Sequence, residues 1–195
     1  MKVVAEGAEA IVYDTELDGI KAFMKRRIQK KYRIEAMDTR IRTKRSRNEA
    51  KIIAIVSKAG INAPKLIMFD GYDIYMSPVN GRKLAEISGS LALFGKVGAM
   101  LGKLHNAGVV HGDYTPANII VDNGDPYVID FGLSEMTNAA EEKAFDVLLM
   151  KRSAAKASYL RFLEGYKSES SDAKVVLERL VIVEKRGRYQ SRTLT

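Results

Sequence analysis

The chain has no cysteine and no tryptophan, and its 195 residues include only four prolines and two histidines. Without cysteine it can form neither a disulfide framework nor a thiolate metal site, so we expect an intracellular, cytoplasmic protein. Hydrophobic runs are short: a stretch such as Ile52–Val56 is far below the roughly 20 residues that a membrane helix needs. The first residues also lack a signal-peptide core, so no association with a membrane is expected.

Hydrophobic residues make up 46% of the chain, enough for one compact domain or two small lobes. The net charge is +8 and is unevenly placed, because residues 25–51 hold twelve lysines and arginines but only three acidic residues. A second basic cluster near the end contains Lys185, Arg186 and Arg188. Such clusters are typical of proteins that contact RNA phosphates, although a solvated helix face is the alternative.

The most informative motif is the sequence H-G-D-x-x-x-x-N at residues 111–118, followed by D-F-G at 130–132. In protein kinases this order places a base near the attacking hydroxyl and two oxygen ligands on the Mg²⁺ ions that neutralise the phosphates. Asp113 is the candidate catalytic base, and Asn118 and Asp130 are the candidate metal ligands. The motif therefore predicts binding of ATP and Mg²⁺.

The two halves of the motif are joined by a predicted hairpin. Residues 118–121 and 127–129 have the composition of short strands, and the turn between them, Asp-Asn-Gly-Asp-Pro, favours a tight reversal. The hairpin is expected to hold Asn118 and Asp130 close together. Because Mg²⁺ shares its coordination sphere with phosphates and water, one amide and one carboxylate suffice on the protein side.

The remaining pattern predicts an antiparallel sheet followed by helices. Strands are expected at residues 3–5, 10–13, 20–25, 65–69 and 73–76, and helices at 42–59, 91–107, 139–152, 156–166 and 171–183. This order predicts an α+β, bilobal protein-kinase-like fold in a single domain, residues 1–195. Its parts are a small β-rich N-lobe with one main helix (1–76), a hinge (77–81), a reduced α-helical C-lobe (82–184) and a basic tail (185–195).

On this plan ATP lies between the lobes. Lys25, at the end of the third strand, is expected to contact the α- and β-phosphates, and Glu49 on the following helix is expected to pair with it. Lys25 would contribute to catalysis through its charge and its position. The candidate nucleotide contacts are Gly7, Ala8, Glu9, Lys25, Glu49, Met76, Pro78, Asn118 and Asp130.

With these residues placed, the chain resembles the small atypical, RIO-related protein kinases of the PRPK type, which belong to the KEOPS (EKC) complex. The resemblance spans nearly the whole chain, and residues 6–10 and 25–33 are more discriminating than the H-G-D motif. It rests on residues 6–10 (EGAEA), 25–33, 45–50, 111–118, 129–134, 142–146 and the basic tail.

The resemblance implies a Mg-ATP-dependent serine/threonine kinase or ATPase that supports threonylcarbamoyladenosine modification of tRNA. It also implies partners: a metal-dependent ATPase subunit on the C-lobe and tail, a small regulatory subunit on the N-lobe, and tRNA. Lys185, Arg186 and Arg188 become candidate RNA or partner contacts, and Asp146 matches the residue that braces the catalytic loop in larger kinases. His111, beside the catalytic aspartate, is expected to hold backbone geometry.

Two departures from ordinary protein kinases limit the expected activity. The nucleotide loop has one glycine, Gly7, in place of G-x-G-x-x-G, so fewer backbone amides can approach the phosphates. The segment after Gly132 is short and contains no A-P-E sequence, which makes phosphorylation of free protein substrates doubtful. Two alternatives remain open: a small-molecule phosphotransferase of the aminoglycoside or choline kinase type, and a non-catalytic scaffold that binds RNA or a partner.

Overall fold

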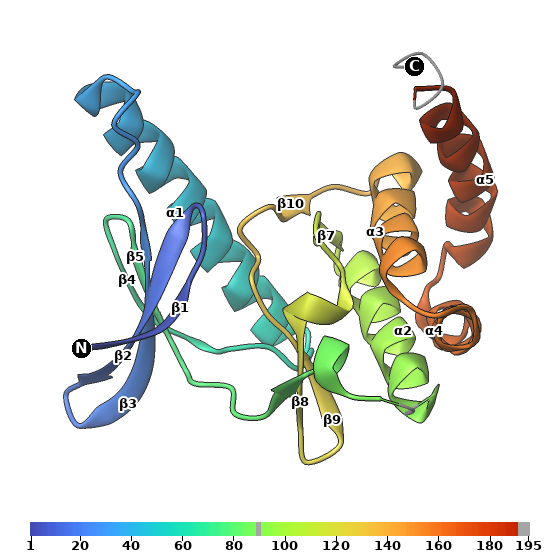
Figure 1. Ribbon diagram of the computed structural model, residues 1–195, viewed down its shortest axis with the longest axis horizontal. Coiled ribbons are helices and arrows are strands. Elements are labelled where there is room, and N and C mark those ends of the chain that lie inside the picture. The colour runs from blue at the N-terminus through green and yellow to red at the C-terminus, as the bar shows by residue number, and fades with distance from the viewer. Residues whose placement is uncertain (89–90, 191–195) are drawn as a thin grey trace.

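A five-stranded antiparallel sheet and one long helix form the first half of the chain (Figure 1). The computed structural model describes residues 1–88 and 91–190, with side chains as far as Arg186. The sheet order is β1-β2-β3-β5-β4, so β3 is central and its Ala22 and Met24 are fully buried. The strands are β1 (Lys2–Glu6), β2 (Ala10–Leu17), β3 (Ile20–Arg27), β4 (Leu66–Asp70) and β5 (Asp73–Met76).

The helix of this lobe, α1 (Glu35–Lys58), begins seven residues before the expected start at 42. The prediction of its start was wrong because residues 35–45 are mostly charged and show little apolar period. Asp38 accounts for the longer helix: it is fully buried, and it accepts hydrogen bonds from Arg42 Nε (2.6 Å) and Lys30 N (3.2 Å). A tertiary contact therefore orders a turn that hydrophobic periodicity does not reveal.

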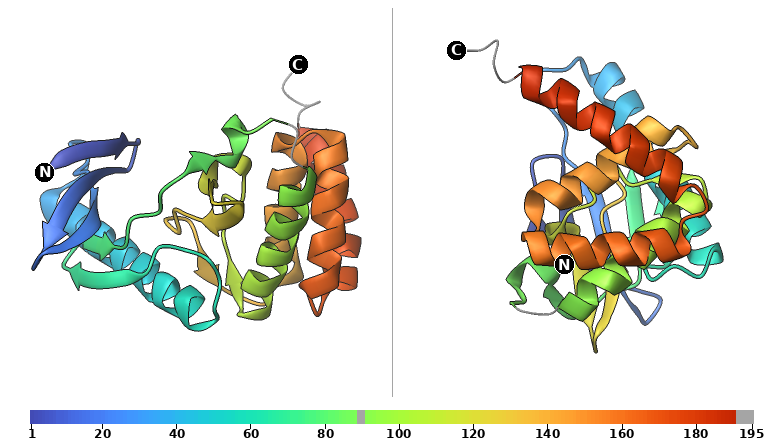
Figure 2. Two further views of the ribbon diagram at one scale, coloured as in Figure 1. Left: turned by 90° about the horizontal axis from the view of Figure 1, so that it is seen from below. Right: turned by 90° about the vertical axis from the view of Figure 1, so that its right-hand side faces the viewer.

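Beyond the segment 77–81 the chain forms the second lobe, which is mainly helical (Figure 2). Two small sheets, β6-β8-β9 and β7-β10, line its side toward the first lobe. The elements are β6 (Arg82–Lys83), η1 (Leu84–Glu86), α2 (Leu91–Asn106), β7 (Val109–Val110), η2 (Pro116–Asn118), β8 (Ile119–Asp122), β9 (Asp125–Val128), β10 (Glu135–Met136), α3 (Ala140–Ser153), α4 (Lys156–Glu169) and α5 (Ala173–Gln190). The predicted bilobal α+β fold is confirmed.

Two boundaries in this lobe differ from expectation. Helix α5 continues to Gln190, so part of the segment expected as a tail is helical. The β8–β9 hairpin is present but reverses earlier, at Asn123 (φ 49°) and Gly124 (φ 83°), which is the backbone that an Asn-Gly turn favours. Just outside the hairpin, Ile129 N donates to Asn118 O at 2.9 Å, so the backbone before Asp130 is tied to Asn118.

Glycines allow α2 and α4 to pack in close contact, side by side in the second lobe (Figure 2). A Cβ at Gly98 would lie 1.9 Å from Phe162 O, and one at Gly165 would lie 1.9 Å from Gly95 O. Neither contact could be relieved by turning a side chain, because the opposing atoms are backbone oxygens. The two helices can approach this closely only because these positions have no side chain. Helix α4 also carries the buried aromatic residues Phe162 and Tyr166.

We predict that Gly98→Ala destabilises the protein by about 1–3 kcal/mol or more, because the methyl group has no room at this contact. Gly95→Ala is the matched control, since the nearest atom to its new Cβ would be Arg161 O at 3.9 Å. The control should be neutral or more stable by about 0.5–1 kcal/mol, the usual gain for glycine to alanine inside a helix. Urea unfolding measures both, and equal effects would contradict the packing argument.

Candidate functional site

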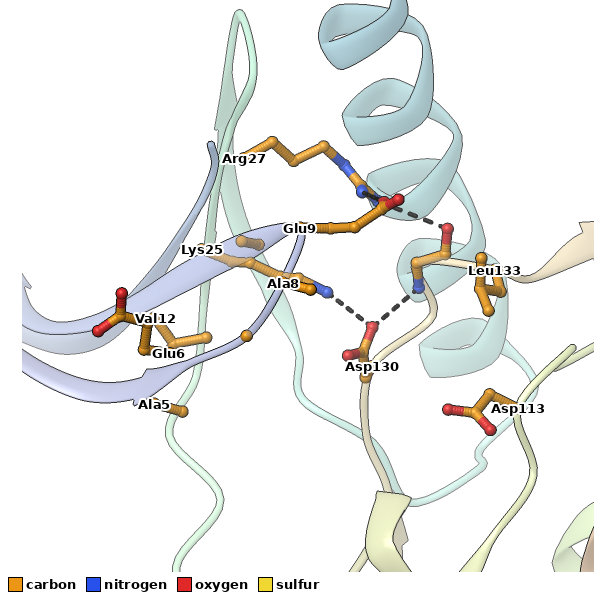
Figure 3. Close-up of a pocket in the computed structure, with 13 residues that line it drawn as sticks. Ala5, Glu6, Ala8, Glu9, Val12, Lys25, Arg27, Asp113, Asp130 and Leu133 are labelled. Carbon is orange, nitrogen blue, oxygen red and sulfur yellow. Dashed lines mark hydrogen bonds and ion pairs between the residues drawn. The ribbon is translucent and has the colours of Figure 1, made fainter. Parts of the chain in front are cut away.

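A cleft of about 430 Å³ lies between the lobes, under the turn that joins β1 and β2 (Figure 3). It brings together residues from the start of the chain, from β3 and from the segment after β9. The residues that line it are Ala5, Glu6, Gly7, Ala8, Glu9, Ala10, Val12, Lys25, Arg27, Asp113, Asp130, Gly132 and Leu133. Six of the predicted site residues therefore meet in one cavity: Gly7, Ala8, Glu9, Lys25, Asp113 and Asp130.

Lys25 connects the two lobes at the floor of this cleft. Its Nζ lies 2.5 Å from Glu49 Oε1 on α1 and 2.7 Å from Asp130 Oδ1 in the second lobe. The pairing of Lys25 with Glu49 that the sequence predicted is thus present. Burial opposes the positive charge, but the two carboxylates outweigh this effect and raise the pKa of Lys25, so the ammonium form is favoured.

Asp130 has an unusual backbone conformation, with φ 63°, which turns its carboxylate toward Lys25 (Figure 3). Its Oδ1 accepts hydrogen bonds from Lys25 Nζ and from Gly132 N, the latter at 3.1 Å. Burial works against the negative charge, but Lys25 and the Gly132 amide hold the pKa of Asp130 below its ordinary value. The carboxylate is therefore ionised at neutral pH, as a metal ligand must be.

Asp113 lines the opposite wall, whereas Asn118 does not line the cavity and is hydrogen-bonded to Asp113. Asn118 Nδ2 donates to Asp113 Oδ2 at 2.8 Å and to Asp113 O at 2.9 Å. These bonds turn the amide nitrogen toward Asp113 and leave the amide oxygen as the group that a cation would take. They also fix the Asp113 carboxylate, which faces the cleft (Figure 3).

A buried network supports the loop that carries Asp113. Asp146 on α3 accepts hydrogen bonds from His111 N (2.7 Å) and Gly112 N (2.8 Å), and its side chain is fully buried. The His111 ring bridges Ile129 O (Nε2, 3.1 Å) and Asp113 N (Nδ1, 3.2 Å), so it joins the two halves of the motif. Both residues thus contact backbone of the loop that carries Asp113, and their role as structural supports stays a prediction.

Asp130 and Asn118 fit a magnesium–phosphate complex through their donor chemistry. One carboxylate and one amide oxygen are what Mg²⁺ uses when phosphates and water complete its six ligands. Residues 1–88 and 91–186 contain no cluster of three or more histidine, aspartate or glutamate side chains that could hold a metal alone. A nucleotide-bound Mg²⁺ is therefore the kind of ion that these residues suit.

Sequence reasoning gave Arg27 no role in the site, although it lines the cleft and is only 5% exposed. Its Nη2 donates to Glu49 Oε2 at 2.8 Å, so one carboxylate bridges Arg27 and Lys25. The signal was available, because residues two apart on a strand point to the same face of the sheet. From the sequence alone, Arg27 belongs to a basic run and to residues 25–33 of the resemblance.

Other predicted contacts lie outside the cavity. Met76 is buried at the end of β5, where it pairs with Phe23 and Leu66, and neither it nor Pro78 lines the cleft. Their role in nucleotide binding stays a prediction. In the basic segment, Lys185 is exposed and Arg186 Nη1 pairs with Glu141 Oε1 at 2.8 Å, whereas the side chain of Arg188 is outside the described residues.

The two lobes and the sheet order define a protein-kinase-like fold, and similar solved structures agree. The chain is similar to the Rio2 kinase of Chaetomium thermophilum, solved as an ADP/Mg²⁺-phosphoaspartate complex, with a TM-score of 0.67, 16% identity and coverage of 97% of this chain and 72% of that one. A model of the RIO domain family matches residues 6–156, and the chain belongs to this family, in its Bud32 group.

Two relatives illustrate the similarity in sequence. The chain is 33% identical to the KEOPS complex subunit Bud32 of Pyrococcus abyssi, over 99% of this chain and 98% of the relative. It is 39% identical to the "Probable bifunctional tRNA threonylcarbamoyladenosine biosynthesis protein" of Methanocaldococcus jannaschii, over 96% of this chain. The match spans 37% of the bifunctional relative's length. In the part of this chain that the structure describes, no helix has the length and apolarity to cross a membrane.

The contact between Lys25 and Asp130 predicts a pH dependence of stability. Because the pKa of Asp130 is lower in the folded than in the unfolded state, its contribution is fully present above the ordinary value of 3.8 and is lost as the pH falls through the folded value. Since the side chain is 52% exposed, the contribution should be below about 1 kcal/mol.

We therefore expect Asp130→Asn to lose less stability than the unmodified protein between about pH 5 and about pH 3. Urea unfolding at the two pH values measures this difference. Asp18→Asn, which removes an exposed carboxylate from the turn between β2 and β3, is the control and should behave as the unmodified protein does. If the unmodified protein, Asp130→Asn and Asp18→Asn all lost the same stability between these pH values, the lowered pKa of Asp130 would be contradicted.

Proposed function

We propose that the protein is a Mg-ATP-dependent atypical serine/threonine kinase or ATPase that acts within a KEOPS-type complex and supports threonylcarbamoyladenosine modification of tRNA. The observation that carries the chemical part is the convergence of two carboxylates on Lys25, whose Nζ lies 2.5 Å from Glu49 Oε1 and 2.7 Å from Asp130 Oδ1, at a cleft that Asp113 also lines. The biological part is supported by relatives whose names include the KEOPS complex and threonylcarbamoyladenosine biosynthesis.

The geometry supports a division of labour among the side chains. Lys25 would bind the α- and β-phosphates by charge, and Glu49 would keep its ammonium group in position. Asp113 would accept the proton of the attacking hydroxyl or water as the new O–P bond forms and the bond from the γ-phosphorus to the bridging oxygen breaks, which releases ADP. Mg²⁺, held by Asn118 and Asp130, would neutralise the phosphate charge.

The acceptor is limited by the short segment that follows the cleft. Only β10 and adjoining turns lie between Gly132 and the start of α3 at Ala140, and the described part of this segment contains no A-P-E sequence. An ordinary kinase uses a longer activation segment to hold a peptide. Hydrolysis of ATP, or phosphorylation of a partner already docked beside the cleft, needs no such platform, and we propose these two reactions.

We propose three partners. A metal-dependent ATPase subunit would dock on the C-lobe and tail, a small regulatory subunit on the N-lobe, and tRNA across the assembly. Support comes from a relative named as bifunctional, in which the matching region is 37% of a longer chain, so that this region is covalently joined to further sequence there. Relatives named as KEOPS or EKC complex subunits also support an assembly.

The catalytic assignment predicts different effects for two carboxylates. Asp130→Ala should abolish MgATP turnover, because it removes a metal ligand and one partner of Lys25. Asp113→Asn should leave nucleotide binding nearly intact and slow turnover by about 10²–10⁴-fold, the range for a lost general base. Calorimetric titration with MgADP and an ATPase assay, with the partner subunit and tRNA added, separate the two, and unchanged turnover in both variants would refute the assignment.

A basic stripe on α1 supports the contact with RNA. We use this name for Arg40, Lys44, Arg47 and Lys51, which follow one another at three- and four-residue intervals and so share one face of the helix. All four are exposed, line one groove, and make no ion pair within the described chain. By contrast, Arg42 and Arg45 pair with Asp38 and Glu9 on another face.

Cations left without partners along about 16 Å of helix suit a phosphodiester backbone. We expect the double variant Lys44→Gln/Arg47→Gln to weaken binding of a tRNA transcript and to reduce the slope of log affinity against log salt by about one per lost phosphate contact. Lys2→Gln/Lys21→Gln removes the same charge from exposed sites on β1 and β3 and should leave the slope nearly unchanged.

The same assay tests the tail. Replacement of Lys185, Arg186 and Arg188 by glutamine should reduce the slope if these residues contact RNA. If the slopes of all the variants equal that of the unmodified protein, neither basic region binds RNA phosphates, and the proposed contact with tRNA is wrong.

A further inference from the structure

The nucleotide loop, residues 6–10, is tied down by side chains from other elements. Glu9 Oε2 lies 2.7 Å from Arg45 Nη1 on α1 and 3.1 Å from Arg27 Nη1 on β3 (Figure 3 shows Glu9 and Arg27). Lys30 Nζ donates to Ala8 O at 2.5 Å. Within the loop itself, Gly7 N donates to Ala10 O at 2.9 Å. The turn is therefore fixed at its tip by ion pairs as well as by its own backbone.

Arg27 links the loop to the rest of the cleft. Besides Glu9, its guanidinium contacts Glu49 Oε2 at 2.8 Å and Gly132 O at 3.5 Å. Glu49 carries one negative charge but already pairs with the buried ammonium of Lys25. Lys25 also pairs with Asp130, so Glu49 is shared between two buried cations. Glu9 adds a further carboxylate beside the buried Arg27 guanidinium, and this ion pair ties the loop to β3.

Arg45 connects the loop to the position of α1. It lies one helical turn before Glu49 on the same helix. Arg45 holds Glu9 above the cleft, and Glu49 holds Lys25 at its floor. Arg45 does not line the cleft, whereas Glu9 and Arg27 do. Any effect of Arg45 on nucleotide must therefore pass through the side chains that it holds.

We propose that Glu9, Arg27 and Arg45 form a clasp that holds the nucleotide loop over the phosphates and makes the loop follow α1. The clasp replaces the glycine-rich sequence that this loop lacks: a loop with one glycine gains its fixed shape from ion pairs to β3 and α1. A displacement of α1 would then weaken the Lys25–Glu49 pair and release the loop at the same time. This inference rests on the proposed binding of MgATP at the cleft.

The test is a double-mutant cycle with Glu9→Gln and Arg45→Met. Each single variant should raise the KM for MgATP by about threefold to tenfold and change kcat by less than about twofold, because an ion pair that is partly exposed contributes modestly. Arg45→Met should add almost nothing when Glu9→Gln is already present, since Arg45 acts through Glu9. Arg45→Lys, which keeps the charge, should recover part of the loss.

A second readout does not need turnover. Amide hydrogen exchange of residues 5–10 in the nucleotide-free protein should become faster in Glu9→Gln and Arg45→Met, because the clasp orders the loop before nucleotide binds. Arg161→Met is the control. It breaks an exposed pair of the same kind, Arg161 Nη1 to Glu164 Oε2 at 2.7 Å on α4, and should change neither exchange in the loop nor KM.

The outcomes are distinct. Additive effects on KM would show that Arg45 acts independently of Glu9 and would overturn the clasp, as would unchanged exchange and KM in both single variants. If the unmodified protein does not bind MgATP, the proposed function fails, and with it the role of the clasp in nucleotide binding. In that case faster exchange in the two variants would still show that the ion pairs order the loop.

Discussion

The ammonium group of Lys25 is the contact on which the site depends. It lies on the central strand of one lobe, it is 8% exposed, and it contacts Glu49 on α1 and Asp130 in the other lobe. A buried cation between two carboxylates is stable only while both anions remain close, so the pair distances also set the positions of α1 and of the D-F-G segment. The geometry of the cleft therefore follows from one charge and its partners.

The second lobe supplies rigidity to the residues that face this charge. Asp146 binds the backbone of the loop that carries Asp113, and the His111 ring joins that loop to the strand end before Asp130. Beneath them, α2 and α4 approach closely because glycines occupy their contact, as at Gly98. Close packing and buried hydrogen bonds thus leave the candidate base and metal ligands little freedom to move.

Much of this arrangement could be predicted from the sequence, because short-range patterns carry it. The β8–β9 hairpin follows from an Asn-Gly turn between apolar segments, and the bilobal order follows from strands that precede helices. The roles of Asp113, Asn118 and Asp130 come from the spacing of a motif and stay predictions. The start of α1 was missed because Asp38, a charged residue, is buried there by contacts with Arg42 and Lys30.

The sequence by itself determined which elements form and which residues can supply charge, since periodicity, turn composition and motif order are local properties. Only the tertiary structure decided which cations are paired. Arg27, Arg45 and Arg47 belong to one basic run, yet the first two bind Glu9 and the third is exposed on the other side of α1. The physical reason is that ion pairs depend on distances of a few ångströms between residues far apart in the chain, which folding alone establishes.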